Sequence, residues 1–469
     1  MRTPFESGRI QLAILAILIF AFAWITFHHL GRKPLIDFDE AIYAQVSAEA
    51  LQNHTPLGFT WLGNPALHRP EPWFEKPPVM IWLTEFSYLV FGVNEFAARF
   101  WPAVFAVLML PLTFFFVKSL AQSTAAAILS VAVYFAAFQF DDYAGVLQMD
   151  IPVGFFVLLA LLSFWRAREA GRFYFLFWAA LGFGVMIKSV IGLLPLPVIL
   201  LYSALAGDFK FLKSRNLWLG ALLFFAFVLP WHAIEHFRYG RSFWDQYLFY
   251  HVLQRFSGTL EGNGGPFLFY FDILFGQPLL FWCLACSLIY FIIRAFKSKA
   301  HLFVLTAFLF IFLFFSNAGT KLPPYFLVIY PSAAAMIGMT LGDLVRFLES
   351  HKPNCGKIFA AAAVLVFMIA SFGNFQSRLA RENDPQLVSE KAVGEFLRNN
   401  VPGQRVYYYS VSQVKPSIMF YSGRTVYFYD FKRLPKPEAK FILISRVPPQ
   451  FPDKTELFSA ATEAVYQIQ

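Results

Sequence analysis

The residues of this chain that could do chemistry are few, and the first of them follow an apolar run. Only 14% of the 469 residues are charged, yet Asp37, Asp39 and Glu40 fall together in "LIDFDEAIYAQV". One explanation is structural: Asp37 as an N-cap and Glu40 three residues later would form a capping box. Asp39 would then complement the helix dipole from the first turn. A catalytic carboxylate is the alternative that this spacing leaves open.

Further polar side chains stand at the ends of other apolar runs. They are Glu75 and Lys76 in "FEKPP", Asp141 and Asp142 in "FDDYA", Asp150 in "MDIP", Lys188 in "MIKSV", His251 and Arg255 in "YHVLQRF", and Lys321 in "GTKLPP". Charge near a membrane is costly, so such residues are candidates for function. Structural alternatives exist: Lys76 and Lys321 could snorkel to headgroups, Asp150 could cap a helix, His251 could be a structural histidine, and Glu75 could pair with Lys76. Lys188, nearly alone in an apolar stretch, is harder to explain in this way.

Taken together, these side chains suit the transfer of a group from a lipid phosphate. Several cations would hold a phosphate at headgroup depth, and an arginine could grip it with two parallel hydrogen bonds. One nearby carboxylate would suffice to take a proton from the acceptor, whereas a glycosidase needs two carboxyl groups. The sequence contains no GxGxxG opening a helix, no Walker A motif, no HExxH and no Cys/His cluster, so nucleotide chemistry and zinc hydrolysis lack support. It leaves a divalent metal open.

The elements that must position these residues are membrane helices. Hydrophobic residues make up 58% of the chain and 60 residues are phenylalanine, far from the composition of a soluble domain. We predict an all-α polytopic membrane protein with eleven spans of about 20 residues each. The expected spans are 9–30, 97–118, 122–140, 146–165, 172–187, 190–206, 216–235, 267–293, 301–317, 323–343 and 357–374.

Lysine and arginine orient these spans. With eleven spans, the basic clusters between successive helices all fall on one side, which the positive-inside rule makes cytoplasmic. The net charge of +9 therefore points to cytoplasmic loops and not to nucleic acid. The opposite side receives residues 31–96 and the tail from about 375. The first apolar run is too long for a signal peptide and is expected to stay as a membrane helix.

Two segments outside the membrane carry their own patterns. In residues 31–96, "DEAIYAQVSAEAL" is helical in pattern and "FEKPPVMIWLTEFSYLVFG" predicts a helix at the membrane surface. In the tail, "SEKAVGEFLRNN" predicts an amphipathic helix, and "RVYYYSV", "SIMFYSG", "RTVYFYDF" and "KFILISR" predict strands. We therefore expect a membrane domain over 1–374 and a small soluble α/β domain over 375–469.

Seven segments in this order resemble one family. They are "DEAIYAQVSAEAL", "FEKPPVMIWL", "FGVNEFAARFWPAVFAVL", "MDIPVGFF", "IKSVIGLLPLPV", "FWDQYLFYHVLQRFSG" and "KLPPYFLVIYPSAA". The chain is similar, over about residues 10–345, to lipid A 4-amino-4-deoxy-L-arabinose transferases and to bacterial dolichyl-phosphate-mannose-protein mannosyltransferase-like enzymes. These are integral-membrane glycosyltransferases of the GT-C fold.

The resemblance implies roles for individual residues. The first-loop "DE" matches Asp39, the presumed base, with Glu40 beside it, and Asp150 matches a further catalytic position. Lys76 and Arg255 match positions associated with the donor phosphate, and Lys188 and Lys321 match further motif positions. Glu75, Tyr43 and His251 complete the expected site.

The resemblance also implies the reaction. It predicts an inverting transfer of a pentose or hexose from a polyprenyl-phosphate donor, on the periplasmic face of a bacterial inner membrane, to a lipid A-like lipid or a protein. The competing hypothesis is a glycolipid transporter without transferase activity; transporters place their site near the midplane and often contain internal repeats, whereas the charges here lie at the outer edge.

Overall fold

A computed structural model describes residues 8–61, 71–401, 403–409, 415–429, 441–447, 449, 451 and 453–468. Its contacts divide the chain into two compact units. The helical unit comprises Met1–His28, Glu75–Met80 and Pro102–Gln376. The loop–sheet unit comprises His29–Phe74, Ile81–Trp101 and Ser377–Gln469.

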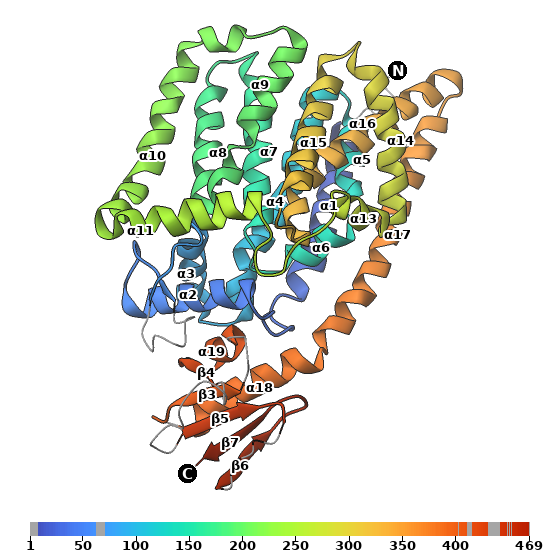
Figure 1. The fold of residues 1–469 in the computed structure, drawn as a ribbon. Coiled ribbons are helices and arrows are strands. Elements are labelled where there is room, and N and C mark those ends of the chain that lie inside the picture. The colour runs from blue at the N-terminus through green and yellow to red at the C-terminus, as the bar shows by residue number, and fades with distance from the viewer. Residues whose placement is uncertain are drawn as a thin grey trace. The chain divides into compact units, whose positions relative to one another are not determined.

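The helical unit is built from long apolar helices and short connecting turns (Figure 1). Its elements are α1 (Gly8–His28), α4 (Glu95–Ala121, from Pro102 on), α5 (Thr124–Val133), α6 (Phe138–Ala144), α7 (Asp150–Ala167), α8 (Phe173–Lys188), η3 (Ser189–Leu193), α9 (Pro195–Ala206), η4 (Lys210–Lys213), α10 (Arg215–Tyr239), α11 (Arg241–Trp244), η5 (Asp245–Gln254), α12 (Arg255–Ser257), α13 (Phe269–Phe275), α14 (Pro278–Ala295), α15 (Lys299–Asn317), η6 (Pro323–Ile329), α16 (Tyr330–His351) and α17 (Cys355–Glu382, up to Gln376).

The prediction of a polytopic helical protein is confirmed. Among the described residues, nine helices are long and apolar enough to cross a membrane, and α5 with α6, bent by 71°, forms a tenth candidate. The predicted span 190–206 corresponds to α9, whose 12 residues fall short of the roughly 20 that a bilayer core requires. The predicted span 267–293 is not one continuous helix. Helix α13 ends at Phe275 and α14 begins only at Pro278, because proline favours the start of a helix.

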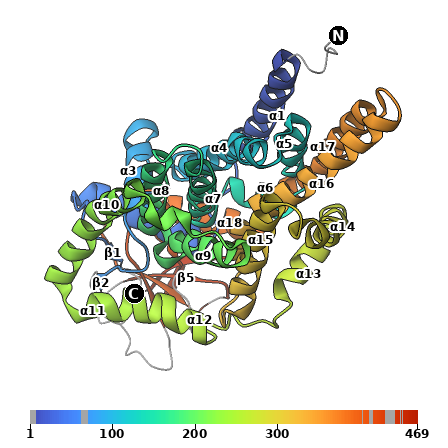
Figure 2. The ribbon, with the colours of Figure 1, turned by 90° about the horizontal axis from the view of Figure 1, so that it is seen from above.

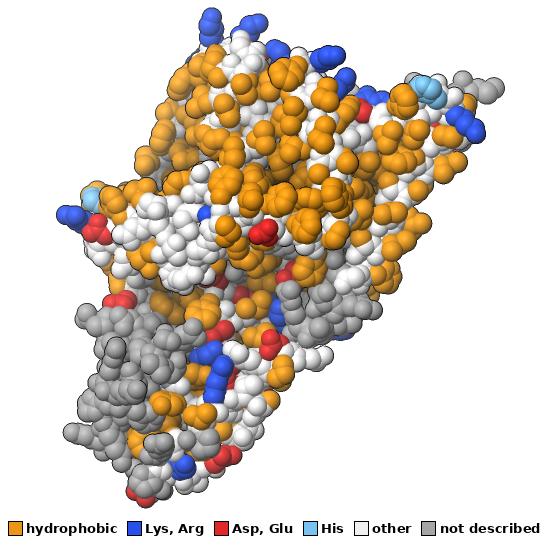
Figure 3. Space-filling view, turned by 45° about the vertical axis from the view of Figure 1, so that its right-hand side comes forward, with side chains coloured by type: hydrophobic (Ala, Val, Ile, Leu, Met, Phe, Trp, Pro, Cys, Tyr) orange, Lys and Arg blue, Asp and Glu red, His pale blue; other side chains and the backbone are white. Residues whose placement is uncertain are grey.

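Packing in the helical unit places α8 between α7 and α10, as the view from above shows (Figure 2). Many of its large apolar side chains, including Phe20, Trp24, Leu222, Trp282 and Phe372, are exposed. In the space-filling view, apolar side chains form a broad belt on this unit, and lysine and arginine gather at one end of it (Figure 3). An exposed apolar surface of this extent suits contact with lipid.

The loop–sheet unit combines the first long loop with the tail. It contains α2 (Asp39–Asn53), β1 (Thr60–Trp61), β2 (Glu71–Pro72), α3 (Val79–Phe91, from Ile81 on), the first turns of α4, α18 (Pro385–Asn400), β3 (Val406–Tyr409), α19 (Pro416–Ser422), β4 (Val426–Tyr429), β5 (Phe441–Ser445), β6 (Lys454–Ser459) and β7 (Ala464–Ile468). Strands β1 and β2 pair antiparallel. The other five form one sheet in the order β4-β3-β5-β7-β6, with β3 parallel to both neighbours and β7 antiparallel to both of its own.

Both helices of the tail pack on one face of this five-stranded sheet. Leu397 of α18 and Ile418 of α19 share a buried apolar cluster with Ile442 of β5. On the other face, Tyr407 and Leu443 belong to a second cluster. Successive strand residues alternate between the two faces, as a pleated sheet requires.

One of the strands predicted in the tail is a helix instead. "SIMFYSG" was expected to be a strand, but it forms most of helix α19. Pro416 occupies the first turn, and Gly423 follows the last residue at φ 63°, the pattern of proline at the start and glycine past the end of a helix. The helices predicted in "DEAIYAQVSAEAL" and "SEKAVGEFLRNN" are confirmed as α2 and α18. Strands β6 and β7 were not predicted.

Candidate active site

The capping box predicted at the start of α2 is not formed. The N-cap residue is Phe38, without a side-chain cap bond, and Asp37 lies outside the helix. Phe38 has φ 66° and ψ −124°, a left-handed conformation that costs a non-glycine residue roughly 1–3 kcal/mol. Such a conformation persists only where the surroundings impose it, so the segment before Asp39 must be held by other contacts.

Arg99 makes many of those contacts. Its guanidinium forms two hydrogen bonds with the Glu40 carboxylate, at 2.7 and 2.9 Å. It also donates to the backbone carbonyls of Leu30, Lys33 and Pro34. Glu40 in turn accepts a hydrogen bond from the backbone N–H of Ile36 at 2.7 Å. Arg99 and Glu40 are 1% exposed, so this buried pair organises the turn.

Asp39 is the first residue of α2 and is partly buried. A carboxylate in the first turn is stabilised by the helix dipole. Tyr43, one turn further on the same face, is buried with its ring 6.0 Å from that of Trp73 in an edge-on arrangement. This ring contact packs Tyr43 against Trp73.

The helical unit contains a cavity of about 330 Å³ that gathers most of the predicted cations. Its lining consists of Glu75, Lys76, Lys188, Ser189, Val190, Ile191, Tyr247, His251, Val252, Leu253, Arg255, Phe256, Phe314, Phe315, Ala318, Thr320 and Tyr325. We call it the basic cavity. Five residues proposed from the sequence, Glu75, Lys76, Lys188, His251 and Arg255, therefore lie around one space although their sequence positions span about 180 residues.

Lys188 reaches the basic cavity because the chain turns sharply after it. Helix α8 ends at Lys188, Ser189 has φ 50°, and η3 folds back on α8. A Cβ on Gly192 would lie 2.2 Å from the carbonyl carbon of Gly184, so only glycine permits this approach. The Lys188 ammonium lies 2.5 Å from Asp150 Oδ1 and 4.5 Å from the centre of the Tyr325 ring. Asp150 is buried at the start of α7 and does not line the cavity.

A second close approach positions Arg255. The backbone N–H groups of Gly319 and Thr320 donate to the carbonyls of Phe256 and Arg255, at 2.7 and 2.9 Å. A Cβ on Gly319 would lie 2.6 Å from the backbone of Gly258, so the two segments cross in direct contact. With its backbone fixed in this way, Arg255 donates to both oxygens of Glu261 and to the Tyr325 hydroxyl.

Glu75, Lys76 and His251 form the third part of the basic cavity. Glu75 and Lys76 are joined by a hydrogen-bonded ion pair. Burial alone would raise the pKa of Glu75, but the charges of Lys76 and Arg255 and the nearby His251 lower it to about 2. Burial, with Lys76 and Arg255 nearby, lowers the pKa of His251 to about 4 against the attraction of Glu75. At neutral pH the lining therefore holds a carboxylate and a neutral imidazole.

The lining carries more positive than negative charge. Lys76, Lys188 and Arg255 face it with side chains only 13–15% exposed, whereas Glu75 is the one carboxylate among the described lining residues. The partners of Lys188 and Arg255, Asp150 and Glu261, lie outside the lining. Much of the remaining wall is apolar, with Phe256, Phe314 and Phe315 among it. An anion attached to an apolar chain fits both parts of this wall.

One predicted cation is placed elsewhere. Lys321 is buried, its ammonium donates to the carbonyl of Ala318, and it does not line the basic cavity. Three residues that sequence reasoning missed are Arg99, Thr320 and Tyr325. Arg99 lay within the quoted segment "FGVNEFAARFWPAVFAVL", where an arginine in an apolar run was itself a signal. Within the described part of the chain, no group of three His, Cys, Asp or Glu side chains is placed to hold a metal ion.

Comparison with known proteins shows which proteins this chain resembles. Residues 75–234 match the family model of dolichyl-phosphate-mannose-protein mannosyltransferases. An undecaprenyl phosphate-alpha-4-amino-4-deoxy-L-arabinose arabinosyl transferase of Enterobacter sp. (strain 638) is 25% identical over 374 residues, 75% of this chain and 64% of that protein. The chain thus spans less than two thirds of that relative.

Solved structures extend the match to the whole fold. ArnT from Cupriavidus metallidurans in the apo state has a TM-score of 0.78 at 16% identity, covering 96% of this chain and 97% of that one. This chain has the GT-C fold. The same protein bound to undecaprenyl phosphate gives a TM-score of 0.74 at 15% identity, with 99% and 98% covered. An oligosaccharyltransferase of Archaeoglobus fulgidus gives 0.64 at 14%, with 92% and 65% covered. The resemblance of this chain to the GT-C glycosyltransferases is therefore confirmed, together with its fold class.

Proposed function

We propose that this chain is a glycosyltransferase that moves a sugar from a polyprenyl-phosphate donor to an acceptor. The basic cavity is the observation that carries the proposal. In the part of the chain that the structure describes, three cations and one carboxylate line it beside aromatic and aliphatic side chains. A lipid-linked phosphate needs both a cationic and an apolar surface, and the described relatives include one whose structure holds undecaprenyl phosphate.

The donor phosphate would lie against Arg255, Lys188 and Lys76. Arg255 is held by Glu261 and Tyr325, and Lys188 by Asp150, so these cations are in place before the ligand arrives. Preorganised charges of this kind stabilise the charge that develops on a leaving group. The apolar wall would take the first part of the polyprenyl chain.

In the reaction, an acceptor oxygen attacks the anomeric carbon of the sugar. The bond from that carbon to the phosphate oxygen breaks, and its electron pair leaves with polyprenyl phosphate. Because the leaving phosphate is neutralised by the cations, it needs no proton. The configuration at the anomeric carbon inverts in this single displacement.

Asp39 is the proposed base that takes the proton from an acceptor hydroxyl or orients an acceptor phosphate. The resemblance of "DEAIYAQV" to the family's first-loop motif supports this role, as does the fixed start of α2. No step is assigned to a metal ion, since the described His, Cys, Asp and Glu residues form no suitable cluster. Lys321 and Asp150 are proposed to support the cavity from behind its lining.

The acceptor is proposed to be a lipid A-like glycolipid, because the sequence motifs resemble those of lipid A 4-amino-4-deoxy-L-arabinose transferases. The name of the Enterobacter relative supports the undecaprenyl-phosphate class of donor. The transfer is proposed to occur on the periplasmic face of a bacterial inner membrane, the side opposite the basic loops. A protein acceptor is the second candidate, since the family model that matches residues 75–234 describes protein mannosyltransferases.

The test is a transfer assay in liposomes with the purified chain and a panel of undecaprenyl-phosphate sugars, read by mass spectrometry of lipid and protein acceptors. Wild type is expected to transfer a sugar with inversion, and Asp39→Asn to lose the transfer. Arg255→Met in the cavity is expected to reduce transfer as well, and Lys299→Met, at a cation outside the cavity, is its control. If wild type moves glycolipid across the bilayer without any covalent transfer, the chain is a transporter and the proposal is wrong. If Asp39→Asn keeps wild-type transfer, only the base assignment falls.

A further inference from the structure

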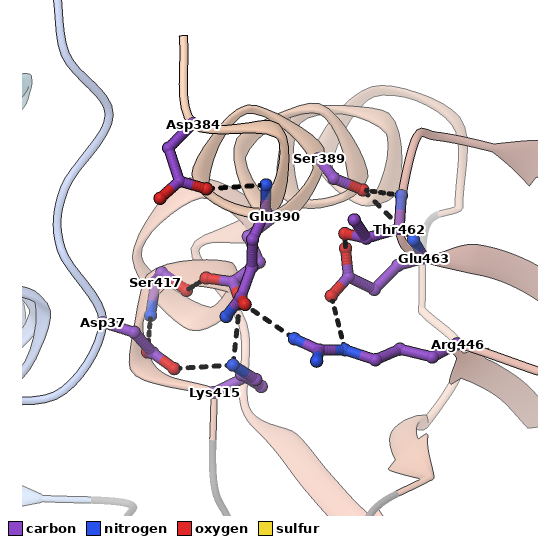
Figure 4. Close-up of polar contacts among 10 residues, drawn as sticks. Asp37, Asp384, Ser389, Glu390, Lys415, Ser417, Arg446, Thr462 and Glu463 are labelled. Carbon is purple, nitrogen blue, oxygen red and sulfur yellow. Dashed lines mark hydrogen bonds and ion pairs between the residues drawn. The ribbon is translucent and has the colours of Figure 1, made fainter. Parts of the chain in front are cut away.

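A buried ionic network in the loop–sheet unit joins the first loop to the tail (Figure 4). The Lys415 ammonium lies 2.9 Å from Asp37 Oδ2 and 2.8 Å from Glu390 Oε1. Ser417 closes the other side: its backbone N–H donates to Asp37 Oδ1 at 3.2 Å, and its hydroxyl donates to Glu390 Oε2 at 2.6 Å. All four Asp37 and Glu390 oxygens are thus engaged by one short segment, the start of α19.

This network is strongly buried and short of positive charge. The side chains of Asp37, Lys415 and Glu390 are 8%, 5% and 0% exposed. Arg446 adds a second cation, 3.9 Å from Glu390, but it also pairs with the buried Glu463. Burial raises the pKa of Asp37, Lys415 opposes this effect, and Glu390 adds to it. Two carboxylates therefore share the one ammonium at the centre of the network.

The network holds the segment that directly precedes helix α2. Asp37 stands two residues before Asp39 and one before Phe38, the residue with left-handed backbone. Arg99 and Glu40 hold the other side of the same turn. The Tyr421 hydroxyl, one helical turn beyond Ser417 in α19, accepts a hydrogen bond from the backbone N–H of Leu35. Residues from both ends of α19 are therefore bonded to the segment that leads into α2.

We propose that Lys415 is a positioning residue for the transfer reaction: by clamping Asp37 against Glu390, it fixes the start of α2 and the orientation of the Asp39 carboxylate. This inference rests on the proposed function, in which Asp39 is the base. It makes the small α/β tail part of the catalytic apparatus. The tail would act through geometry, without touching the donor.

The clamp predicts a specific kinetic defect. A base misplaced by about 1 Å can cost about a hundredfold in rate. Lys415→Met, which keeps the length of the side chain and removes the charge, is expected to lower kcat at least about tenfold and leave the KM for the donor unchanged. Lys415→Arg, which keeps the charge, is expected to recover most of kcat. Asp37→Asn added to Lys415→Met is expected to cost little more, because both changes break one contact.

The matched control is Glu463→Gln. Glu463 is a buried carboxylate of the same unit that contacts neither Asp37 nor Lys415. Both single variants should lower the melting temperature, but only Lys415→Met should lower kcat beyond what its folded fraction explains. Equal kcat in the two variants after correction for folded fraction would overturn the clamp.

A second readout does not depend on activity. Hydrogen exchange should become faster at the backbone N–H groups of residues 35–42 in Lys415→Met and stay unchanged in Glu463→Gln. If wild type shows no transfer with any donor, the proposed function fails, whereas the clamp is still judged by this exchange. Unchanged exchange over residues 35–42 in a folded Lys415→Met protein would refute the clamp.

Discussion

The basic cavity of the helical unit and the ionic network of the loop–sheet unit both contain buried cations and carboxylates, but they arrange these charges differently. In the network, one ammonium sits between the carboxylates of Asp37 and Glu390, so its charge is satisfied inside the protein. In the cavity, the partners of Lys188 and Arg255 stand behind the lining, so positive charge still faces the space. The two regions therefore differ in where the carboxylate partners lie, and not in whether cations are present.

Substitution of Arg99 should give the largest effect, a loss of stability, because its ion pair with Glu40 is almost fully buried. Arg99→Met leaves the Glu40 carboxylate buried without its partner, which typically costs about 3–5 kcal/mol of unfolding free energy. We expect a large drop in melting temperature and in expression. Arg99→Lys should rescue only in part, because lysine cannot form the two parallel bonds. A Glu40→Gln/Arg99→Met protein no more stable than Arg99→Met would contradict this account.

Arg255 should give the next largest effect, and on activity instead of folding. Among the described residues that line the cavity, Arg255 supplies the one guanidinium. Arg255→Met is expected to reduce transfer about a hundredfold, the range seen when a donor to a developing charge is removed. Binding of undecaprenyl phosphate, measured by scintillation proximity, should weaken in parallel. A matched variant in the other unit, Arg446→Met, should leave donor binding unchanged.

His251 should make stability depend on pH. Its folded pKa of about 4 lies below the ordinary 6.5, so between these values the unfolded chain binds a proton that the folded chain does not. Stability should therefore fall as pH is lowered through this window, by about 1 kcal/mol at pH 5.5. Glu75 contributes little between pH 7 and 5.5, because its folded pKa of about 2 and its ordinary value of 4.5 both lie below this range. Melting curves of His251→Gln should lose this part of the slope between pH 7 and 5.5; an unchanged slope would count against a buried neutral imidazole.

The smallest effect is expected at Lys299. Its ion pair with Asp208, at 3.5 Å, is exposed, and such pairs contribute roughly 0–1 kcal/mol. Lys299→Met should change neither transfer nor melting temperature measurably at physiological salt. A loss of transfer activity in this variant would show that a charge outside the basic cavity is needed for transfer, and would contradict the assignment of the phosphate-binding charges to the cavity alone.

Sequence reasoning reached the cavity but missed the network. Lys76, Lys188 and Arg255 could be predicted because each charge interrupts an apolar run, and topology assigns them one side of the membrane. The pairs Arg99–Glu40 and Lys415–Asp37 join residues 59 and 378 positions apart, and neither residue pattern contains a signal for its partner. The predicted capping box is wrong for the same reason, because Asp37 accepts hydrogen bonds from Lys415 and Ser417 of the tail. Helix α19 was different, since Pro416 and Gly423 marked both of its ends in the sequence.

The crossing of Gly258 and Gly319 has a consequence for inhibition. The backbone of this crossing supports Arg255 and Thr320, so that part of the cavity wall is shaped by main-chain hydrogen bonds and by the lack of side chains. A compound bound against this part of the wall would contact backbone atoms, which a substitution cannot change without moving the main chain. A side chain at Gly319 would displace the backbone that carries Arg255, the arginine proposed to bind the donor phosphate. Resistance is therefore expected to arise instead in the aromatic wall, at Phe256, Phe314 or Phe315.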